Sequence, residues 1–542
     1  MKRACLLKKL FIIAMFVLTG IFQANALDAP LPKTAPVSLP KLSKAQMLED
    51  FDYMTKLLQD FLPEAIVTKK VYGIDVFAKL KSCRDRITGQ ETPVEFAQIV
   101  SDALVACKGN HLFVSDMLYY LKGVRAKKNV RDVFVDDDAI DINHLYALKM
   151  EKKSESSYLS ERLINLVYHD GAYYNLFDFS IDGTVYKRGM KLIALNGKDQ
   201  KALLSLLQAR LNKFDFKRGI FYGDIVEGDD FYLFLPDNEK EKLTFQFQDE
   251  NNEIFKITLD EKSKLSVLKK GHGYLPTKKV LYLPELHILY IRIPCMEEND
   301  LPFYCDGIKK ETVGKVVKGV VIDIRNNPGG SDNVWIEILN RIIAKDRTME
   351  FHNAMKSDIR VWQAFRRIKE LPAAHKEYFN SLKEEKYPFL DNIPFKILFT
   401  YIILKPDKES LQLTTPIYVI SHDAYSAAGG LLAASGMNDD IISVGTRNPA
   451  PLGRSLPPIY FSLPNSKLIF SMKPTIDLTD SKTADDVLHT KVEVEVEMTA
   501  KERLDYLNRD IGKIPLEDAL TKYDPYFKKV LELLNAKNQS GK

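Results

Sequence analysis

The sequence feature that most restricts the fold is the regular alternation of apolar strands and helices across residues 276–500. Four apolar runs there have the length of a buried strand: 287–294, 318–324, 416–421 and 441–444. Helical patterns at 333–344 and 427–435 follow the second and the third of these runs. A strand, a turn and a helix repeated in this way predict parallel β-sheet with right-handed crossovers. We therefore expect an α/β domain in this region.

An insertion at residues 346–413 interrupts the alternation. Its sequence predicts much helix and a basic character, including the run FRRIK at 365–369. A short basic run of this kind is more typical of a solvated helix face than of a binding patch. We therefore infer no binding site from the insertion.

Two units precede the α/β domain, and a helical tail follows it. Residues 43–118 predict a small helical module, with Ser43 placed to cap a helix whose apolar residues recur at helical spacing. Residues 119–275 have mostly the pattern of β-strands and turns. Within them, residues 186–198, YKRGMKLIALNGK, predict a short strand and an Asn-Gly turn that lead into a helix. Residues 501–542 predict a C-terminal helical tail.

Residues 1–26 have the pattern of a cleaved signal peptide. Four basic residues precede a short apolar run at 10–22. The small residues ANA at 24–26 then form a suitable cleavage site for a signal peptidase. An uncleaved membrane anchor is the alternative, but the run is shorter than the roughly 20 residues that span a bilayer. The Pro-rich residues 27–42 predict a linker. We expect an exported protein, periplasmic or extracellular, with no stable membrane insertion after cleavage.

Composition narrows the range of partners and cofactors. The formal net charge is +4, and loss of the four basic residues of the leader leaves a neutral mature chain. A neutral chain gives no general reason to expect nucleic acid or an anionic membrane as a partner. The mature cysteines permit the disulfides Cys83–Cys107 and Cys295–Cys305, and free buried thiols are the open alternative. No CxxC or Cys/His spacing suggests zinc, and we expect neither a metal nor a cofactor.

Ser426 is the strongest candidate for a nucleophile. It lies in YSAAGG at 425–430, where a predicted strand gives way to a helix, so its hydroxyl would lie near the positive end of the helix dipole. A hydroxyl becomes a nucleophile only when a base removes its proton, and the oxyanion that forms needs N–H donors. Taken alone, a serine at such a place is usually only a helix N-cap.

A second glycine-rich turn could supply those donors. Residues 326–330, NNPGG, follow the apolar run at 318–324, and their glycines leave the backbone N–H groups accessible. By itself a Pro-Gly-Gly sequence usually marks only a turn. Catalysis is indicated only by the two turns together.

These segments together resemble the C-terminal processing (tail-specific) serine peptidases, in particular their tricorn-like branch. VVIDIRNNPGG at 320–330 is similar to the family's strand ending in DxRxNxGG, and YSAA at 425–428 is similar to the turn that holds its nucleophile. CKGNHL at 107–112 resembles the GDGH stretch that supplies the catalytic histidine of the tricorn-like branch. Residues 186–198 resemble the middle of a PDZ domain. The resemblance extends over residues 43–535.

The resemblance implies a fold and a set of roles. The fold would be an α/β catalytic domain of the ClpP/crotonase-like type, with the helical module and a PDZ-like β-rich domain before it. Ser426 would be the nucleophile and His111 the general base, while Gly330, Ala427 and Gly329 would form the oxyanion hole. The substrate would be a peptide or an unfolded protein tail, and the PDZ-like unit would bind chain ends by β-augmentation.

The sequence departs from the family pattern in three places. No lysine stands where the tail-specific branch has one; Arg454 is nearest, and a guanidinium cannot act as a base. Gly430 stands where the family often has an acid, and TK at 490–491 replaces its late Pro-Asp pair. The candidates to orient the predicted base are Asp477, Asp485 and Glu493. A catalytically inactive family member that acts as a peptide-binding envelope protein is the alternative function.

Overall fold

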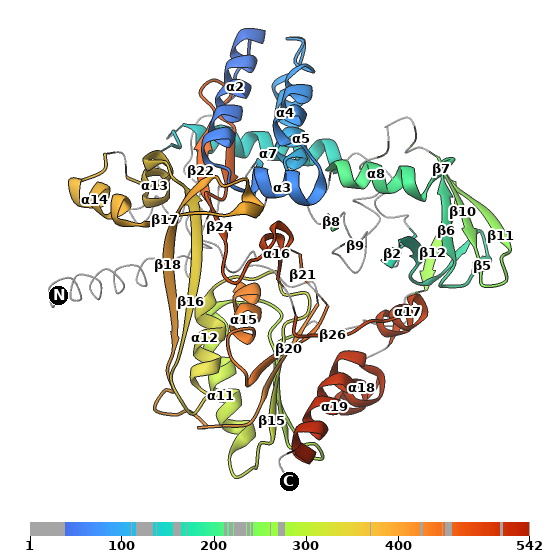
Figure 1. Ribbon diagram of the computed structural model, residues 1–542. Helices are drawn as coiled ribbons and strands as arrows, with labels where there is room; N and C mark the ends of the chain where they lie inside the picture. Colours follow the sequence, from blue (N-terminus) through green and yellow to red (C-terminus); the bar gives the residue numbers. More distant parts are fainter. Residues whose placement is uncertain are drawn as a thin grey trace.

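The computed structural model describes most of the chain after residue 37 (Figure 1). The described residues are 38–109, 111–114, 134–136, 138–155, 164–169, 171–210, 214–215, 220–221, 235, 239, 242–260, 262–268, 277–368, 370–422, 427–446, 448–449, 458–490, 492–509 and 513–540. The predicted signal peptide and most of the predicted linker lie outside them, and so does Ser426.

A six-stranded sheet forms the centre of the α/β domain. Its strands, in spatial order, are β13 (Lys279–Leu283), β14 (Ile288–Arg292), β15 (Gly319–Asp323), β19 (Ile417–Ser421), β20 (Ile441–Gly445) and β26 (Val494–Glu495). β13 runs antiparallel to β14, and every other pair of neighbours in this sheet is parallel. The parallel sheet predicted from the four apolar runs is therefore present.

Helices cover both faces of this sheet because its strands are apolar on both sides. One face, to which Val320 and Ile322 point, carries α11 (Leu301–Thr312), α12 (Asp332–Asn340) and α15 (Ala427–Ser435). The other face, with Val321, carries α17 (Ala500–Asn508), α18 (Leu516–Tyr523) and α19 (Pro525–Ser540). Figure 1 shows α18 and α19 on the opposite side of the strands from α11, α12 and α15. Alternate residues of β15 thus enter two different hydrophobic cores, as the two-residue period of a strand requires.

The insertion at 346–413 is mainly a long antiparallel hairpin. β16 (Arg347–Lys356) pairs along its whole length with β18 (Pro394–Leu404). β17 (Lys383–Lys386) and β24 (Thr475–Asp477) complete a four-stranded sheet in the order β17-β18-β16-β24. The helical parts are α13 (Ile359–Arg366), α14 (Ala373–Ser381) and the 3-10 turn η2 (Pro388–Leu390). The predicted helical character is therefore wrong for most of the insertion, because the aromatic and β-branched residues of β18 pack better in a sheet.

The N-terminal helices share a hydrophobic core with the end of the α/β segment. The helices are α2 (Lys44–Phe61), α3 (Glu64–Tyr72), α4 (Val76–Arg84) and α5 (Pro93–Ala106). They pack on a three-stranded sheet of β1 (Phe113–Val114), β23 (Ile469–Met472) and β22 (Ile459–Ser462). Ser43 caps α2 as predicted, in a capping box with Gln46. Residues from both halves of the chain therefore stabilise this module together.

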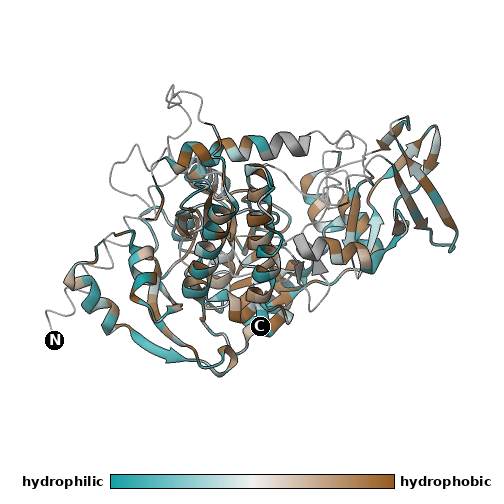
Figure 2. Ribbon diagram, turned by 90° about the horizontal axis from the view of Figure 1, so that it is seen from above, coloured by the Kyte–Doolittle hydropathy of each residue, from teal (hydrophilic) through white to brown (hydrophobic). Residues whose placement is uncertain are grey.

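The β-rich unit lies at one end of the molecule (Figures 1 and 2). Its strands are β2 (Leu166–His169), β3 (Ala172–Asn175), β4 (Asp178–Ile181), β5 (Thr184–Tyr186), β6 (Lys191–Leu195), β7 (Lys198–Asp199), β10 (Leu243–Gln248), β11 (Ile254–Leu259) and β12 (Leu265–Leu268). β6 ends in a turn at Asn196 and Gly197 with left-handed φ angles of 49° and 76°, and α8 (Gln200–Arg210) follows β7. The predicted strand–turn–helix run is therefore present, with the residue types that such a turn favours.

Short elements connect these parts, together with the longer helix α7 (Ala139–Glu155). They are β8 (Phe214–Asp215), β9 (Ile220–Phe221), η1 (Glu298–Asp300), β21 (Asn448–Pro449), α16 (Ala484–Leu488) and β25 (His489–Thr490).

The cysteines of the described residues are free thiols. Cys83, Cys107, Cys295 and Cys305 form no disulfide, so the open alternative of unpaired cysteines is the one that the structure shows. Within the same residues, no helix combines the length and the hydropathy needed to cross a bilayer.

A buried ion network joins the C-terminal helices to the end of β15. Arg325 donates from Nε to Asp323 Oδ1 at 2.9 Å and from Nη1 to Asp524 Oδ2 at 2.6 Å. Arg509 Nη2 also donates to Asp524 Oδ2, at 3.0 Å, and all of these side chains are nearly inaccessible to solvent. Burial alone would raise the pKa of Asp323, but the charges of Arg325 and Arg292 hold it well below its usual value. Each charge of the network is therefore paired inside the protein.

We predict that Asp524→Asn lowers the free energy of unfolding by about 3–5 kcal/mol, because it leaves buried guanidinium charge without its carboxylate. Urea denaturation followed by tryptophan fluorescence measures the change. The matched control is Asp518→Asn, which removes an exposed carboxylate paired with Lys522 at 3.0 Å and should cost less than about 1 kcal/mol. Equal effects of the two substitutions would contradict the prediction.

Candidate active site

The turn after β15 presents a backbone N–H group. Gly330 forms a parallel bridge with Met296, in which Met296 N donates to Gly329 O and Ser331 N donates to Met296 O, both at 2.8 Å. In a bridge of this type the N–H of the central residue points away from the partner strand. The Gly330 N–H therefore points to the side on which β19 lies, and it has no acceptor within the described residues.

Gly330 has no room for a side chain. A Cβ at this position would lie 2.2 Å from Met296 O, and the φ angle of 132° is one that side-chain-bearing residues rarely adopt. Gly329 differs from Gly330, because its N–H donates to Asn327 Oδ1 at 2.7 Å. The Gly329 N–H is therefore already bonded within the turn, while Gly330 keeps an available donor among the described residues, and the predicted oxyanion hole stays a prediction.

The end of β19 lies directly beside this turn. Ile324 N donates to Ile420 O at 2.9 Å, and Asn326 N donates to His422 O at 2.7 Å. α15 begins at Ala427, so four residues, 423–426, connect His422 to the helix. These four, with Ser426 among them, are outside the described residues. Ala427 stands at the N-terminus of α15, where the helix dipole favours negative charge. The two predicted N–H donors therefore come from the segments that follow the adjacent strands β15 and β19.

His422 is tied to the C-terminal helices. The Arg503 guanidinium donates to His422 Nε2, and His422 Nδ1 lies 2.7 Å from Thr446 Oγ1. A guanidinium has no acceptor, so Nε2 must carry the lone pair and Nδ1 the proton. His422 is therefore a neutral donor to Thr446. The sequence places it at a strand end, but no local pattern reveals Arg503, which lies 81 residues away.

His111 lies in a tight loop after α5. Lys108 and His111 have left-handed φ angles of 55° and 51°, which are uncommon for residues other than glycine and tend to occur at functional sites. Ser471 Oγ donates to His111 O at 2.6 Å and so attaches the loop to β23. Because Ser426 is not described, the pairing of His111 with it stays a prediction.

Buried charges lie next to this loop. Glu64 and Lys473 are 5% and 1% exposed, and a Cβ at Gly109 would lie 3.1 Å from Glu64 Oε2. Burial, together with the positive charge of Lys473, lowers the pKa of His111 to about 3. Burial lowers the pKa of Lys473 to about 8, although Glu64 and Asp477 act against this shift. His111 is thus neutral at pH 7, the form in which an imidazole can accept a proton.

The three candidates to orient His111 lie in different places. Glu493 accepts from Ser443, with 3.0 Å between Oε2 and Ser443 Oγ, so the structure does not bring its carboxylate to His111. Asp477 acts electrostatically on Lys473, which in turn acts on His111. Asp485 lies in the first turn of α16 (Ala484–Leu488), which packs on α3. Asp477 and Asp485 therefore remain candidates, and Glu493 does not.

Asp332 is a titratable residue near the turn that sequence reasoning missed. It follows Gly330 by two residues, in the first turn of α12, and its Oδ1 accepts from Trp335 Nε1 at 2.8 Å. Burial raises the pKa of Asp332 to about 6. Its position after NNPGG was the only signal in the sequence.

Comparison with known proteins identifies a related family and a shared fold. Residues 287–460 match the model of peptidase family S41. No curated protein sequence matches the chain. A structure of mature CPAF in complex with lactacystin aligns with a TM-score of 0.53 at 14% identity, over 91% of this chain and 99% of that one. Mature CPAF alone gives 0.52 at 13%, over 91% and 98%.

The family match confirms the predicted resemblance to the C-terminal processing peptidases and supports a hydrolase of the serine-peptidase type. The matched residues contain both the NNPGG turn and Ser426. The similarity to the CPAF structures shows a common fold, with mixed α/β content and several sheets. A PDZ domain is not among the confirmed features.

We predict that the stability of the protein falls as the pH is lowered from about 6.5 toward 3. In this window unfolded His111, with its ordinary pKa near 6.5, binds a proton that folded His111, with a pKa of about 3, does not. Proton binding to the unfolded state removes up to about 1.4 kcal/mol of stability per pH unit.

The measurement is urea denaturation at several pH values. His111→Gln should lose stability less steeply with acid than the unsubstituted protein. His352→Gln, which changes a partly exposed histidine beside Glu350, should keep the original slope. An unchanged slope in His111→Gln would contradict the prediction.

Proposed function

We propose that this serine-type peptidase, whose residues 287–460 match peptidase family S41, is an exported enzyme that cleaves peptides or unfolded protein tails with Ser426 as nucleophile and His111 as general base. The observation that carries the proposal is the free N–H of Gly330, held beside the strand end that leads into Ser426. Such a donor is what a developing oxyanion requires.

The chemistry follows from these groups. Neutral His111 removes the proton of the Ser426 hydroxyl as its oxygen attacks the carbonyl carbon of the peptide bond. The N–H groups of Gly330 and Ala427 stabilise the oxyanion, and the dipole of α15 adds to this at Ala427. His111 then gives the proton to the leaving amine, and water releases the acyl group from Ser426 by the same steps.

The environment of His111 suits one part of this cycle and opposes another. The low pKa keeps the imidazole ready to accept a proton at neutral pH, but the Lys473 charge disfavours the imidazolium that forms. A carboxylate partner would stabilise that imidazolium, which is why one of Asp477 and Asp485 should act as the orienting acid.

The proposal also assigns a role to each of the larger domains. The six-stranded sheet with helices on both faces serves as a catalytic domain of the ClpP/crotonase-like type. The β-rich unit, with β6, its Asn-Gly turn and α8, serves as a PDZ-like domain that holds extended peptide by β-augmentation. The inactive peptide-binding alternative is not favoured, because the family match includes both the NNPGG turn and Ser426.

We predict that Ser426→Ala abolishes both hydrolysis of an unfolded casein substrate and covalent labelling by a fluorophosphonate, because the attacking oxygen is gone. His111→Gln should lower kcat by about 10³-fold or more while leaving the fold intact. Ser381→Ala, which changes an exposed serine at the end of α14, is the control and should keep full activity. Labelling that survives Ser426→Ala would refute the assignment of the nucleophile.

We also predict that Gly330→Ala lowers kcat by about 10²–10³-fold, because the added methyl group meets Met296 O and displaces the N–H donor. The steady-state rate on a fluorogenic peptide measures the effect. Gly436→Ala is the matched control, since its Cβ would meet only Ala433 O at 3.8 Å. A kcat for Gly330→Ala within twofold of the original would rule out an oxyanion role for this turn.

A further inference from the structure

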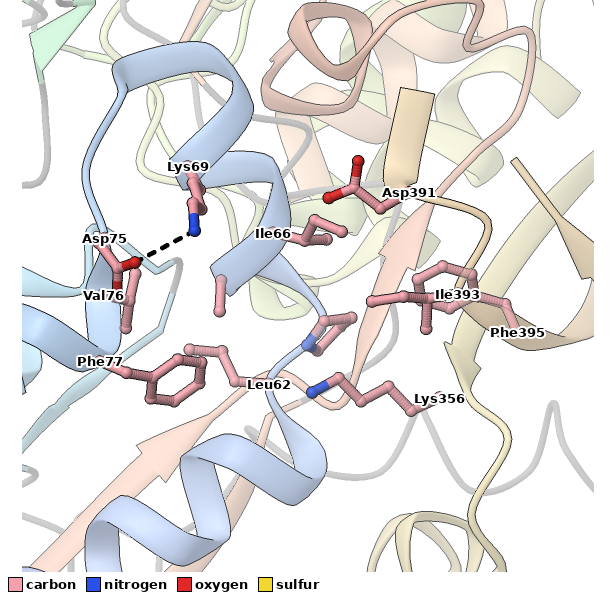
Figure 3. Close-up of a pocket in the computed structure, with 12 residues that line it drawn as sticks. Leu62, Ile66, Lys69, Asp75, Val76, Phe77, Lys356, Asp391, Ile393 and Phe395 are labelled. Carbon is pink, nitrogen blue, oxygen red and sulfur yellow. Dashed lines mark hydrogen bonds and ion pairs between the residues drawn. The ribbon is translucent and has the colours of Figure 1, made fainter. Parts of the chain in front are cut away.

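A small apolar pocket lies beside α3 (Figure 3). Its volume is about 220 Å³, and it lies between α3, the start of α4 and the segment that enters β18. The apolar part of its wall includes Leu62, Ile66, Phe77, Ile393 and Phe395. Pockets for whole drug-sized ligands have volumes of about 300–1,000 Å³, whereas a cavity of about 150 Å³ already holds benzene. The pocket therefore fits a single side chain.

Three ammonium groups lie in or beside this pocket, and two of them are paired. Lys69 Nζ lies 3.1 Å from Asp75 Oδ2, as the dashed line in Figure 3 shows. Lys70, next to Lys69 on α3, pairs with Asp391 of the pocket wall. The charges of these two pairs are therefore balanced within the protein.

Lys356 is the cation of the pocket that has no ion pair within the described residues. Its Nζ donates to Gln59 O at 2.6 Å, and burial lowers its pKa. The two carboxylates whose charges act on Lys356, Asp60 and Asp358, each form an ion pair with Arg360, at 2.9 and 2.6 Å. In Figure 3 the amine of Lys356 points into the pocket beside Leu62. The pocket thus combines an apolar wall with one cation that an anion could approach.

We propose that this pocket binds the last residue of a peptide chain that ends in an apolar side chain, with its free carboxylate on Lys356. The α-carboxylate of such a residue lies next to the apolar side chain, which is the arrangement that the pocket complements. A carboxylate on an ammonium forms a charge-assisted hydrogen bond, the stronger kind of hydrogen bond. A side chain of the size of leucine fills the apolar part without needing a further polar partner.

The pocket and the loop of His111 contact opposite faces of the same helix, α3. Ala65 and Lys69 of α3 line the pocket, while Glu64 and Thr68 of the same helix face the other way. Thr68 Oγ1 donates to Cys107 O at 3.4 Å, and Glu64 lies against Gly109. A chain end bound in the pocket would therefore rest on the same helix that supports the loop of His111. The link between the pocket and His111 rests on the proposed function, whereas binding of a peptide end in the pocket does not.

The test measures binding separately from hydrolysis. A fluorescein-labelled tripeptide of two alanines and a C-terminal leucine is titrated with Ser426→Ala protein, and fluorescence anisotropy gives Kd. The same peptide with a C-terminal amide is the ligand control. We expect the acid to bind and the amide to bind at least about tenfold more weakly, because only the acid offers a charged acceptor to Lys356.

Two substitutions locate the site. Lys356→Met keeps the aliphatic stem and removes the charge, and Ile66→Trp fills the apolar part; each should weaken binding of the acid about tenfold or more. Lys376→Met, at an exposed position of α14, should leave Kd unchanged. Thermal unfolding checks that each variant is folded.

The proposal would be overturned if the acid did not bind, or if the acid and the amide bound equally well. It would also be overturned if Kd were unchanged in both folded pocket variants. Binding of hexanoate without binding of the peptide acid would overturn it too. Failure of the proposed function is distinct from all of these, because it would show as a lack of hydrolysis by the unsubstituted protein.

Discussion

The end of β15, beside the predicted site, depends on the buried side chain of Arg325. Its guanidinium is enclosed between Asp323 and Asp524 and also donates to Tyr506 Oη at 2.6 Å. An unpaired charge buried at this place would lower the stability of the fold by several kcal/mol. Burial of the Arg325 guanidinium therefore requires both carboxylates to be in place. Asp323 ends β15 and Asp524 precedes α19. The turn that carries Gly330 and the C-terminal helices are therefore formed together, and the site is supported from behind by the last part of the chain.

The strand on which the predicted nucleophile depends is held by the same helices. His422 directly follows β19, and it accepts from Arg503 of α17 while donating to Thr446 beyond β20. Tyr526 of α19 lies against its ring, with 6.1 Å between the ring centroids. Because Asn326 N donates to His422 O, the two strand ends of the site share one set of supports. Buried polar contacts therefore fix the two strand ends that lead into the predicted site.

Local sequence patterns were sufficient for the sheet and for part of the site. A buried parallel strand requires a continuous apolar run, as 318–324 and 416–421 have, and a position without room for a Cβ requires glycine, as Gly330 shows. Contacts between distant residues leave no such pattern. The Arg325–Asp524 pair spans 199 residues, and β18 is a strand because β16 pairs with it. A contact between residues close in sequence can also lack a pattern. The sequence NNPGG does not indicate that the Asn327 side chain accepts a hydrogen bond from the Gly329 N–H.

The two halves of the predicted site are supported by different means. The strand ends are fixed by paired charges of the C-terminal helices, whereas the loop of His111 is attached to β23 through Ser471 and lies beside Glu64 of α3 and buried Lys473. The negative charges of Glu64 and Asp477 favour the charged form of Lys473, whose pKa burial lowers to about 8. Movement of α3 would change the distance from Glu64 to Lys473, and with it the charge that acts on His111. The electrostatic state of the base thus depends on the packing of a helix whose opposite face lines the pocket at Lys356.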